Sequence, residues 1–212
     1  MKSLRGCGAV LAALTWAAAP LNAAPQAPSA PAARTRPSPA AEYSLREGRF
    51  TVKPPAGWSA SRDPREDERQ RVFGVQLSGP RSADGVLSTI SIAYYPPDNA
   101  LFKGGAEEFL KRNLGGDPRI VQPAGETTSP VKKTVLGGLP SRSFTRRSHE
   151  YLPPDRTDSK EVAIVEEIEV ADAKTGFYVL EFKSSEQLAA KLKPVYARVR
   201  AGVRFTAATD AR

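Results

Sequence analysis

Residues 176–184 read GFYVLEFKS, and this stretch decides the fold class. In an extended strand, successive side chains point to opposite faces. Tyr178 and Phe182 therefore share one face, and Phe177 and Val179 share the other. A strand that is apolar on both faces is covered on both faces. The sequence thus predicts a sheet with helices on each side.

Short apolar runs, several of them alternating with polar residues, predict the other strands. In one of these runs, Phe73, Val75 and Leu77 alternate with more polar neighbours. The predicted strands cover residues 50–52, 71–77, 86–95, 131–135, 139–148 and 161–171. Between the first two of them, residues 62–71 have the dense mixed charge of a solvated loop.

Two helices are predicted. Residues 106–114 carry apolar side chains at three- and four-residue spacing, and Gly115 follows where a helix needs a left-handed cap. The second helix is predicted to begin at Ser184, where Gln187 completes a capping box. Pro194 lies inside this helix and should kink it or divide it in two, because proline cannot donate to the preceding turn.

Both ends of the chain are predicted to lie outside the folded domain. Residues 1–23 have a basic start, an apolar stretch and small residues at the end, which are the three parts of a cleavable signal peptide. Residues 24–41 contain seven Ala and five Pro and are predicted to form a disordered linker. One domain over 42–207 and a flexible C-terminus over 208–212 complete the organisation. The mature protein is therefore expected to be exported, to the periplasm or outside the cell.

Charge and composition narrow the classes of partner. The formal net charge is +8, with basic residues scattered along the chain, which favours solubility or contact with an anionic surface. The one cysteine, Cys7, lies in the predicted signal peptide, so the mature chain would have no disulfide and no cysteine-ligated metal. No later apolar segment has the length of a transmembrane helix, and no aromatic stacking motif indicates nucleic acid. The oligomeric state stays open.

Several short motifs together resemble the PsbP-like family of exported α/β/α sandwiches. The matching stretches are GRFTV (48–52), PAGW (55–58), the strands at 75–80 and 88–94, the helix from Ala106, FYVL (177–180), KPVY (193–196) and Phe205. Arg204 departs from the pattern, because the family usually has serine there. The resemblance covers residues 48–206 and implies an α+β fold with a central, mainly antiparallel sheet and helices on both faces. It implies a fold and a compartment, since no functional residue of the family maps onto this chain.

His149 is the only histidine and would be the base of a hydrolase. Ser141, Ser143 and Ser148 are near it in sequence, and a hydrolase would need one of their hydroxyls beside the imidazole. However, the chain has no nucleophile elbow of the Gly-x-Ser-x-Gly type. An exposed histidine at the end of a strand is the alternative interpretation, and the chain is predicted not to be an enzyme.

Neither a metal site nor a cofactor is predicted. Carboxylates cluster at Asp63, Glu66, Asp67 and Glu68, and calcium prefers oxygen ligands of this kind. Their spacing fits no calcium-binding loop, and the arginines between them neutralise their charge.

The basic end of the final helix is the one charged feature that indicates a binding site. Lys191, Lys193, Arg198 and Arg200 are candidate contacts for an envelope protein or an anionic surface. The alternative is that they only complement the helix dipole. The leading hypothesis is an exported, non-enzymatic accessory or binding module. A carrier of a small apolar ligand between sheet and helix, or a hydrolase that uses His149, are the other candidates.

Overall fold

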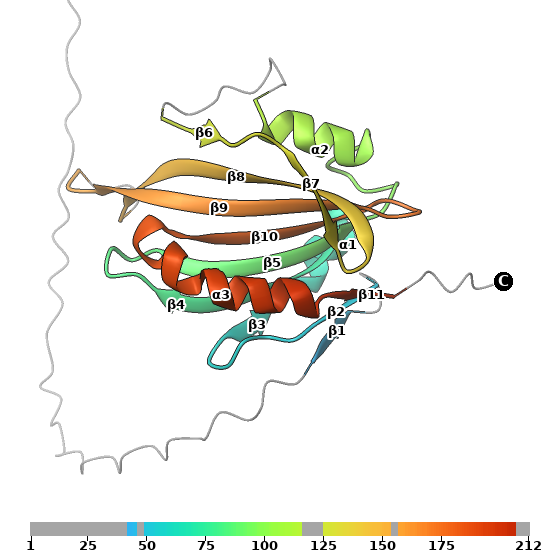
Figure 1. The fold of residues 1–212 in the computed structure, drawn as a ribbon, viewed down its shortest axis with the longest axis horizontal. Coiled ribbons are helices and arrows are strands. Elements are labelled where there is room, and N and C mark those ends of the chain that lie inside the picture. The colour runs from blue at the N-terminus through green and yellow to red at the C-terminus, as the bar shows by residue number, and fades with distance from the viewer. Residues whose placement is uncertain (1–41, 46–48, 116–124, 154–156, 207–212) are drawn as a thin grey trace, which may run out of the picture. The chain divides into compact units, whose positions relative to one another are not determined.

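The computed structural model describes residues 42–45, 49–115, 125–153 and 157–206. The predicted signal peptide, the predicted linker and the C-terminal segment 208–212 lie outside the described residues. The domain is built on an antiparallel sheet in the order β3-β4-β5-β10-β9-β8-β6, with β7 also paired to β8 (Figure 1). Its strands are β3 (Ser59–Ser61), β4 (Phe73–Arg81), β5 (Leu87–Tyr95), β6 (Thr127–Thr128), β7 (Lys132–Leu136), β8 (Leu139–Leu152), β9 (Lys160–Asp172) and β10 (Phe177–Ser185).

A second, three-stranded sheet joins the two ends of the described chain. It consists of β1 (Tyr43–Leu45), β2 (Phe50–Val52) and β11 (Arg204–Phe205), in the order β1-β2-β11. The backbone N–H of Thr206 donates to the carbonyl of Arg49 at 2.8 Å, which extends this pairing by one bond. Only β2 was predicted from the sequence, because two- and three-residue strands carry no readable alternation.

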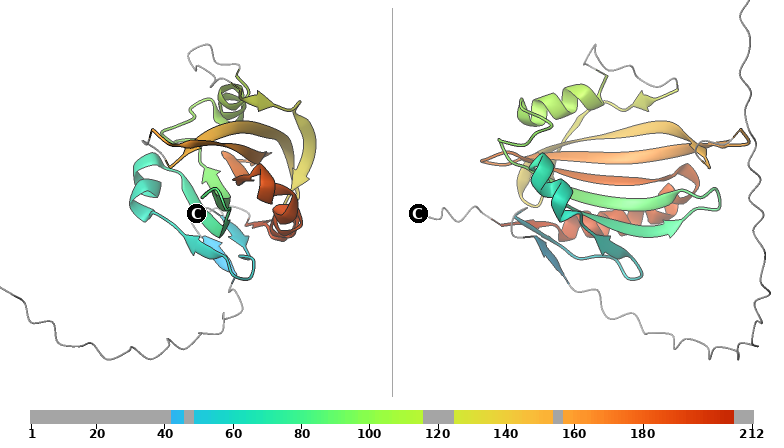
Figure 2. Two further views of the ribbon diagram at one scale, coloured as in Figure 1. Left: turned by 90° about the vertical axis from the view of Figure 1, so that its left-hand side faces the viewer. Right: turned by 180° about the vertical axis from the view of Figure 1, so that it is seen from behind.

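Helices cover both faces of the large sheet, as predicted. α3 (Glu186–Gly202) packs with the small sheet on one face, and α2 (Gly105–Asn113) packs on the other (Figures 1 and 2). The third helix, α1 (Pro64–Gln70), lies beside β4. The fold is therefore α+β with an antiparallel main sheet. Among the described residues, no helix combines the length and apolar character needed to cross a membrane.

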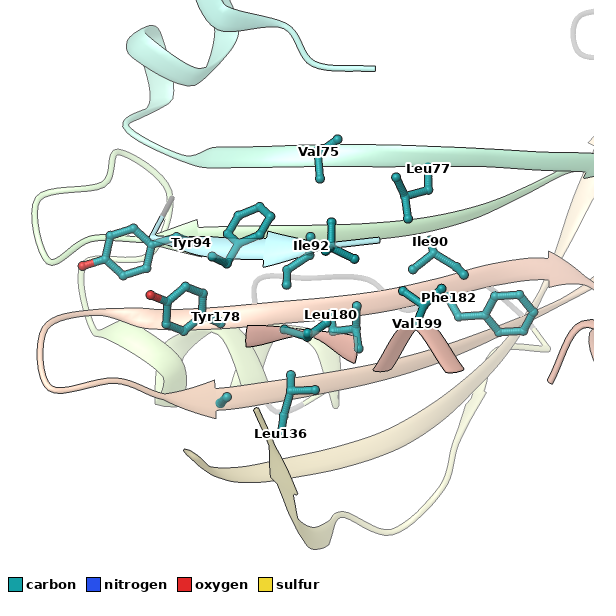
Figure 3. Packing of buried hydrophobic residues seen from close by; sticks show 14 of the residues in the cluster. Val75, Leu77, Ile90, Ile92, Tyr94, Leu136, Tyr178, Leu180, Phe182 and Val199 are labelled. Carbon is teal, nitrogen blue, oxygen red and sulfur yellow. The ribbon is translucent and has the colours of Figure 1, made fainter. Parts of the chain in front are cut away.

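The central strand β10 separates two apolar cores. Tyr178, Leu180 and Phe182 face α3, and Figure 3 shows them in a row with Ile90, Ile92 and Tyr94 of β5. The opposite face of β10 carries Phe177 and Val179, which pack against Phe109 and Leu110 of α2. Burial of both faces confirms the prediction made from residues 176–184.

The predicted loop at 62–71 is wrong, because this segment contains α1. Asp63 caps the helix, accepting hydrogen bonds from the backbone N–H groups of Arg65 and Glu66 at 3.1 and 3.2 Å. Pro64 stands in the first turn, where its missing N–H costs nothing. The charges that suggested a loop instead pair along the helix, as Glu66 does with Arg69.

The structure also bears on two expectations for the last helix. Pro194 does not divide it, because α3 runs from Glu186 to Gly202 with Pro194 inside it, on an exposed position where water can replace the lost hydrogen bond. The predicted capping box does not form either. Ser185 is the N-cap and makes no side-chain cap bond, while the Ser184 hydroxyl pairs with that of Ser88 at 2.9 Å in the core.

Candidate functional site

A pocket of about 460 Å³ lies at one end of the sheet, beside the turn from β7 to β8, the turn from β9 to β10, and the small sheet. Its walls come from Tyr94, Tyr178 and Phe205, and its charged lining residues are Arg49 and Lys174. We call this site the aromatic pocket. Figure 3 shows Tyr94 and Tyr178 at one end of the core row, with both hydroxyl oxygens toward that end.

The aromatic wall is held in a fixed arrangement. Tyr178 stacks on Phe205 with a centroid distance of 4.0 Å and contacts Tyr94 at 4.9 Å. The Tyr94 hydroxyl donates to the carbonyl of Thr175 at 2.5 Å, and the Tyr178 hydroxyl donates to that of Arg49 at 3.2 Å. Burial raises the pKa of Tyr178 to about 12, so this phenol is neutral at physiological pH. The rings thus present apolar faces while backbone carbonyls engage their hydroxyls.

Two glycines allow the turns to approach the wall closely. Gly137 has φ 55°, and a Cβ there would lie 2.7 Å from the ring of Phe205. Gly176 has φ 82°, and a Cβ there would lie 2.1 Å from the carbonyl oxygen of Tyr95. Any larger residue at these positions would therefore displace Phe205 or separate β10 from β5.

The charged part of the lining is purely cationic. The guanidinium of Arg49 lies 5.7 Å from the ring centroid of Tyr94 and donates to Thr175 Oγ1 at 3.4 Å. Lys174 lies exposed on the turn between β9 and β10. The described residues that line the pocket include no carboxylate. The arrangement can therefore hold an apolar body against the rings and a negative group near the cations.

The sequence did not reveal this pocket. Its residues come from five separate stretches of the chain, and each stretch has an ordinary structural interpretation. One available signal was the presence of glycines in two strand connections, at 137–138 and at 176, since glycine marks close backbone approach.

The structure separates the four predicted binding residues on α3. Lys191, Lys193 and Arg198 are exposed, and Lys193 lies 3.5 Å from a carboxylate oxygen of Glu167. Arg200 is instead engaged with the buried carboxylate of Glu169, which accepts bonds of 2.6 and 2.7 Å from its guanidinium. The sequence placed Arg200 with the solvent-exposed charges. The pairing was missed because Glu169 is one of several carboxylates on β9, and no local pattern indicates that this one is buried beside α3.

Glu169 is the centre of a buried polar group. Its side chain is 1 % exposed, and it also accepts hydrogen bonds from Thr134 and Ser141 at 2.6 and 2.7 Å. A smaller polar pocket of about 280 Å³ adjoins this group and is lined by Lys193 and Arg200 among others. Because its partners neutralise and satisfy Glu169, we interpret the group as structural.

His149 lies on β8 with a half-exposed side chain, 3.8 Å from a carboxylate oxygen of Glu161. Within the described parts of the chain, no serine or threonine hydroxyl is hydrogen-bonded to its imidazole. Ser141, one of the three nearby serines, donates to Glu169 instead. The geometry of a hydrolase triad is therefore not assembled around His149 by the residues that the structure describes.

The acidic segment of α1 forms ion pairs. Asp67 binds Arg62 at 2.5 Å, and Glu66 pairs with Arg69. The described residues contain no group of three or more His, Cys, Asp or Glu side chains arranged to hold a metal ion.

No protein-family model and no curated protein matches the chain, but solved structures have similar folds. One is a protein of Bacteroides thetaiotaomicron VPI-5482, with 9% identity and a TM-score of 0.48, over 82% of this chain and 51% of that one. This chain thus spans about half the length of that protein.

Two further similar structures have 13% identity each. Cyanobacterial PsbP (CyanoP) from Synechocystis sp. PCC 6803 has a TM-score of 0.46, over 83% of this chain and 97% of that one. LpqN, involved in cell envelope biogenesis of Mycobacterium tuberculosis, has a TM-score of 0.41, over 80% of this chain and 86% of that one. A PsbP structure is therefore among those similar to this chain, as the sequence motifs predicted.

Proposed function

We propose that the protein is an exported, non-enzymatic binding module that holds a small, largely apolar ligand in the aromatic pocket. The observation that carries this proposal is the pocket itself, with three aromatic rings around a volume of about 460 Å³. Ligand sites in proteins are concave, mostly apolar and commonly 300 to 1,000 Å³ in volume. The proposal places the ligand at the end of the sheet, beside strand turns, and not between the sheet and a helix.

The engaged hydroxyls of the wall support binding over catalysis. Tyr94 and Tyr178 donate to backbone carbonyls, so neither phenol is free to transfer a proton to a bound molecule. The fixed rings instead supply area for stacking and burial, which is how aromatic side chains contribute most to recognition. The pocket therefore suits retention of a ligand.

The test is titration with N-phenyl-naphthylamine, a neutral aromatic probe whose fluorescence rises in apolar surroundings. We expect one probe to bind per chain. Leu139→Trp should abolish that binding, because Leu139 lines the pocket and a larger ring would fill it. Val135→Trp is the matched control, since Val135 is 61 % exposed on the adjacent strand and outside the pocket. Equal binding by all three proteins would contradict the proposal.

A second candidate function is contact with an acidic partner through α3. Lys191 and Arg198 are exposed and form no ion pair within the described chain, so their charge is available to a partner. Such a surface fits an accessory module that engages an envelope protein, and the two functions are compatible because the pocket lining contains no residue of α3.

A further inference from the structure

We propose that the aromatic pocket selects an anionic amphiphile, a ligand with an aromatic or acyl body and one acidic head group such as a carboxylate or sulfonate. This inference rests on the proposed function, since it names the ligand class of the same site. The charge of the pocket lining supports this ligand class. Arg49 and Lys174 are the only charged side chains among the described residues that form the pocket, and both are cations.

Arg49 differs in its contacts from the arginines that hold carboxylates in this domain. Arg142, Arg146 and Arg200 each bind carboxylates. Arg49 forms no ion pair with any residue that the structure describes, and its side chain contacts the ring of Tyr94 and the Thr175 hydroxyl. A guanidinium has five N–H donors, so most of them stay available for a carboxylate or sulfonate.

The backbone of Arg49 is held at the pocket independently of any ligand. Its φ of 54° lies in the left-handed region, which is unfavourable for an arginine. Its carbonyl accepts hydrogen bonds from the Tyr178 hydroxyl at 3.2 Å and from the backbone N–H of Thr206 at 2.8 Å. The backbone from which the Arg49 side chain extends is therefore fixed before a ligand binds, and this lowers the entropic cost of placing the guanidinium on the ligand.

The same contacts define how the ligand lies. Tyr178 is buried and stacks on Phe205, whereas Lys174 is exposed on its turn. Because the hydroxyls of both wall tyrosines are engaged with backbone carbonyls, the aromatic wall offers no free polar group for an acid. The apolar body then packs against the rings, and the acidic group stays at the mouth beside the two cations.

The experiment compares two probes that differ in one charged group, anilinonaphthalene sulfonate and N-phenyl-naphthylamine. Arg49→Asn removes the cation while keeping a residue that tolerates positive φ, and Lys174→Gln removes the second cation. We expect each variant to weaken binding of the sulfonate probe about 10-fold more than binding of the neutral probe, the loss typical of one charge-assisted hydrogen bond. Lys133→Gln, an exposed cation on β7 outside the pocket, should change neither.

The outcomes separate the two proposals. If both probes bind and the two charge variants weaken both equally, or neither, the pocket is a neutral apolar site and this inference is overturned while the proposed function stands. The proposed function requires one-to-one binding of a probe that Leu139→Trp removes. If neither probe binds in this way, the proposed function is overturned together with the inference. Melting curves of the variants test for misfolding, because a loosened domain would lose its cooperative unfolding transition. Such a domain would also bind the sulfonate probe at many sites.

Discussion

The ring of Trp58 lies directly over Gly79 of β4, and a Cβ at that glycine would come within 2.4 Å of two ring atoms. Trp58 is partly buried against the main core. Gly79→Ala should lower the free energy of unfolding by about 1–3 kcal/mol, because the tight contact forces the ring to move. Denaturant titration measures this loss. In the background Trp58→Ala the same change should cost much less, and additive losses would show that the two residues do not interact.

The carboxyl of Glu181 is expected to make the stability of the domain depend on pH. Burial, and next the charge of Glu166, raise the pKa of the Glu181 carboxyl, although Arg146 and Lys183 oppose the shift. A carboxyl with a raised folded-state pKa binds its proton more tightly when folded, so stability is lost as pH rises from about 4.5 through that pKa. Glu181→Gln should therefore melt higher than the native protein at neutral pH, with a difference that shrinks below pH 4.5. A difference independent of pH would contradict this account.

At the scale of the helix α3, Arg200 is predicted to be a stability residue. Its removal leaves the carboxylate of Glu169 buried and without its cation, since Thr134 and Ser141 supply only hydroxyl donors. Breaking one side of a buried ion pair typically costs about 3–5 kcal/mol, and we expect Arg200→Ala to lose an amount in that range. The measurement is chemical denaturation, with Arg198→Ala on the exposed side of the helix as the matched control. A loss below about 1 kcal/mol would show that water reaches Glu169.

The exposed cations of α3 should instead affect association. Changing Lys191, Lys193 and Arg198 to Glu should leave the melting temperature within a few degrees, because exposed ion pairs contribute about 0–1 kcal/mol. If an acidic envelope protein binds this face, the triple variant should associate more slowly, and binding by the native protein should weaken steeply with salt. Equal capture of the same partners by both proteins at low salt would show that the exposed cations of α3 do not contact the partner.

Sequence patterns predict the long, buried elements of this domain and miss its short or exposed ones. The strands β4 and β5 were predicted because buried apolar residues alternate along them, β10 because apolar residues fill both of its faces, and α2 because its apolar spacing is helical. α1 was missed since it has no buried residue and hence no apolar stripe. The small sheet was missed because β1 is too short for a readable pattern, and because β11 is defined by pairing with β2 across most of the chain, which no local pattern records.

At the scale of the whole molecule, the pocket exists because the fold brings distant turns together. Arg49 and Phe205 are separated by nearly the full length of the described chain, and the turns that carry Gly137 and Lys174 complete the lining. Sequence reasoning raised a carrier of a small apolar ligand as an alternative, but its residues could not be named. The Arg49 guanidinium is a candidate ligand contact because it has no carboxylate partner in the described structure. That property depends on the three-dimensional arrangement, which the sequence does not record.

The export of the protein, which we propose from residues 1–23, gives the last prediction. Lys2 and Arg5 precede an apolar stretch, and Ala23 and Ala24 supply the small side chains that signal peptidases accept. We expect the protein isolated from its native compartment to begin at Ala24 or Pro25, because cleavage should follow Ala23 or Ala24. Mass spectrometry of its N-terminal peptide measures this directly. An intact Met1 in the exported pool would contradict cleavage, and recovery of the protein only from the cytoplasm would contradict export. A binding module that collects an amphiphile outside the cytoplasm requires this export.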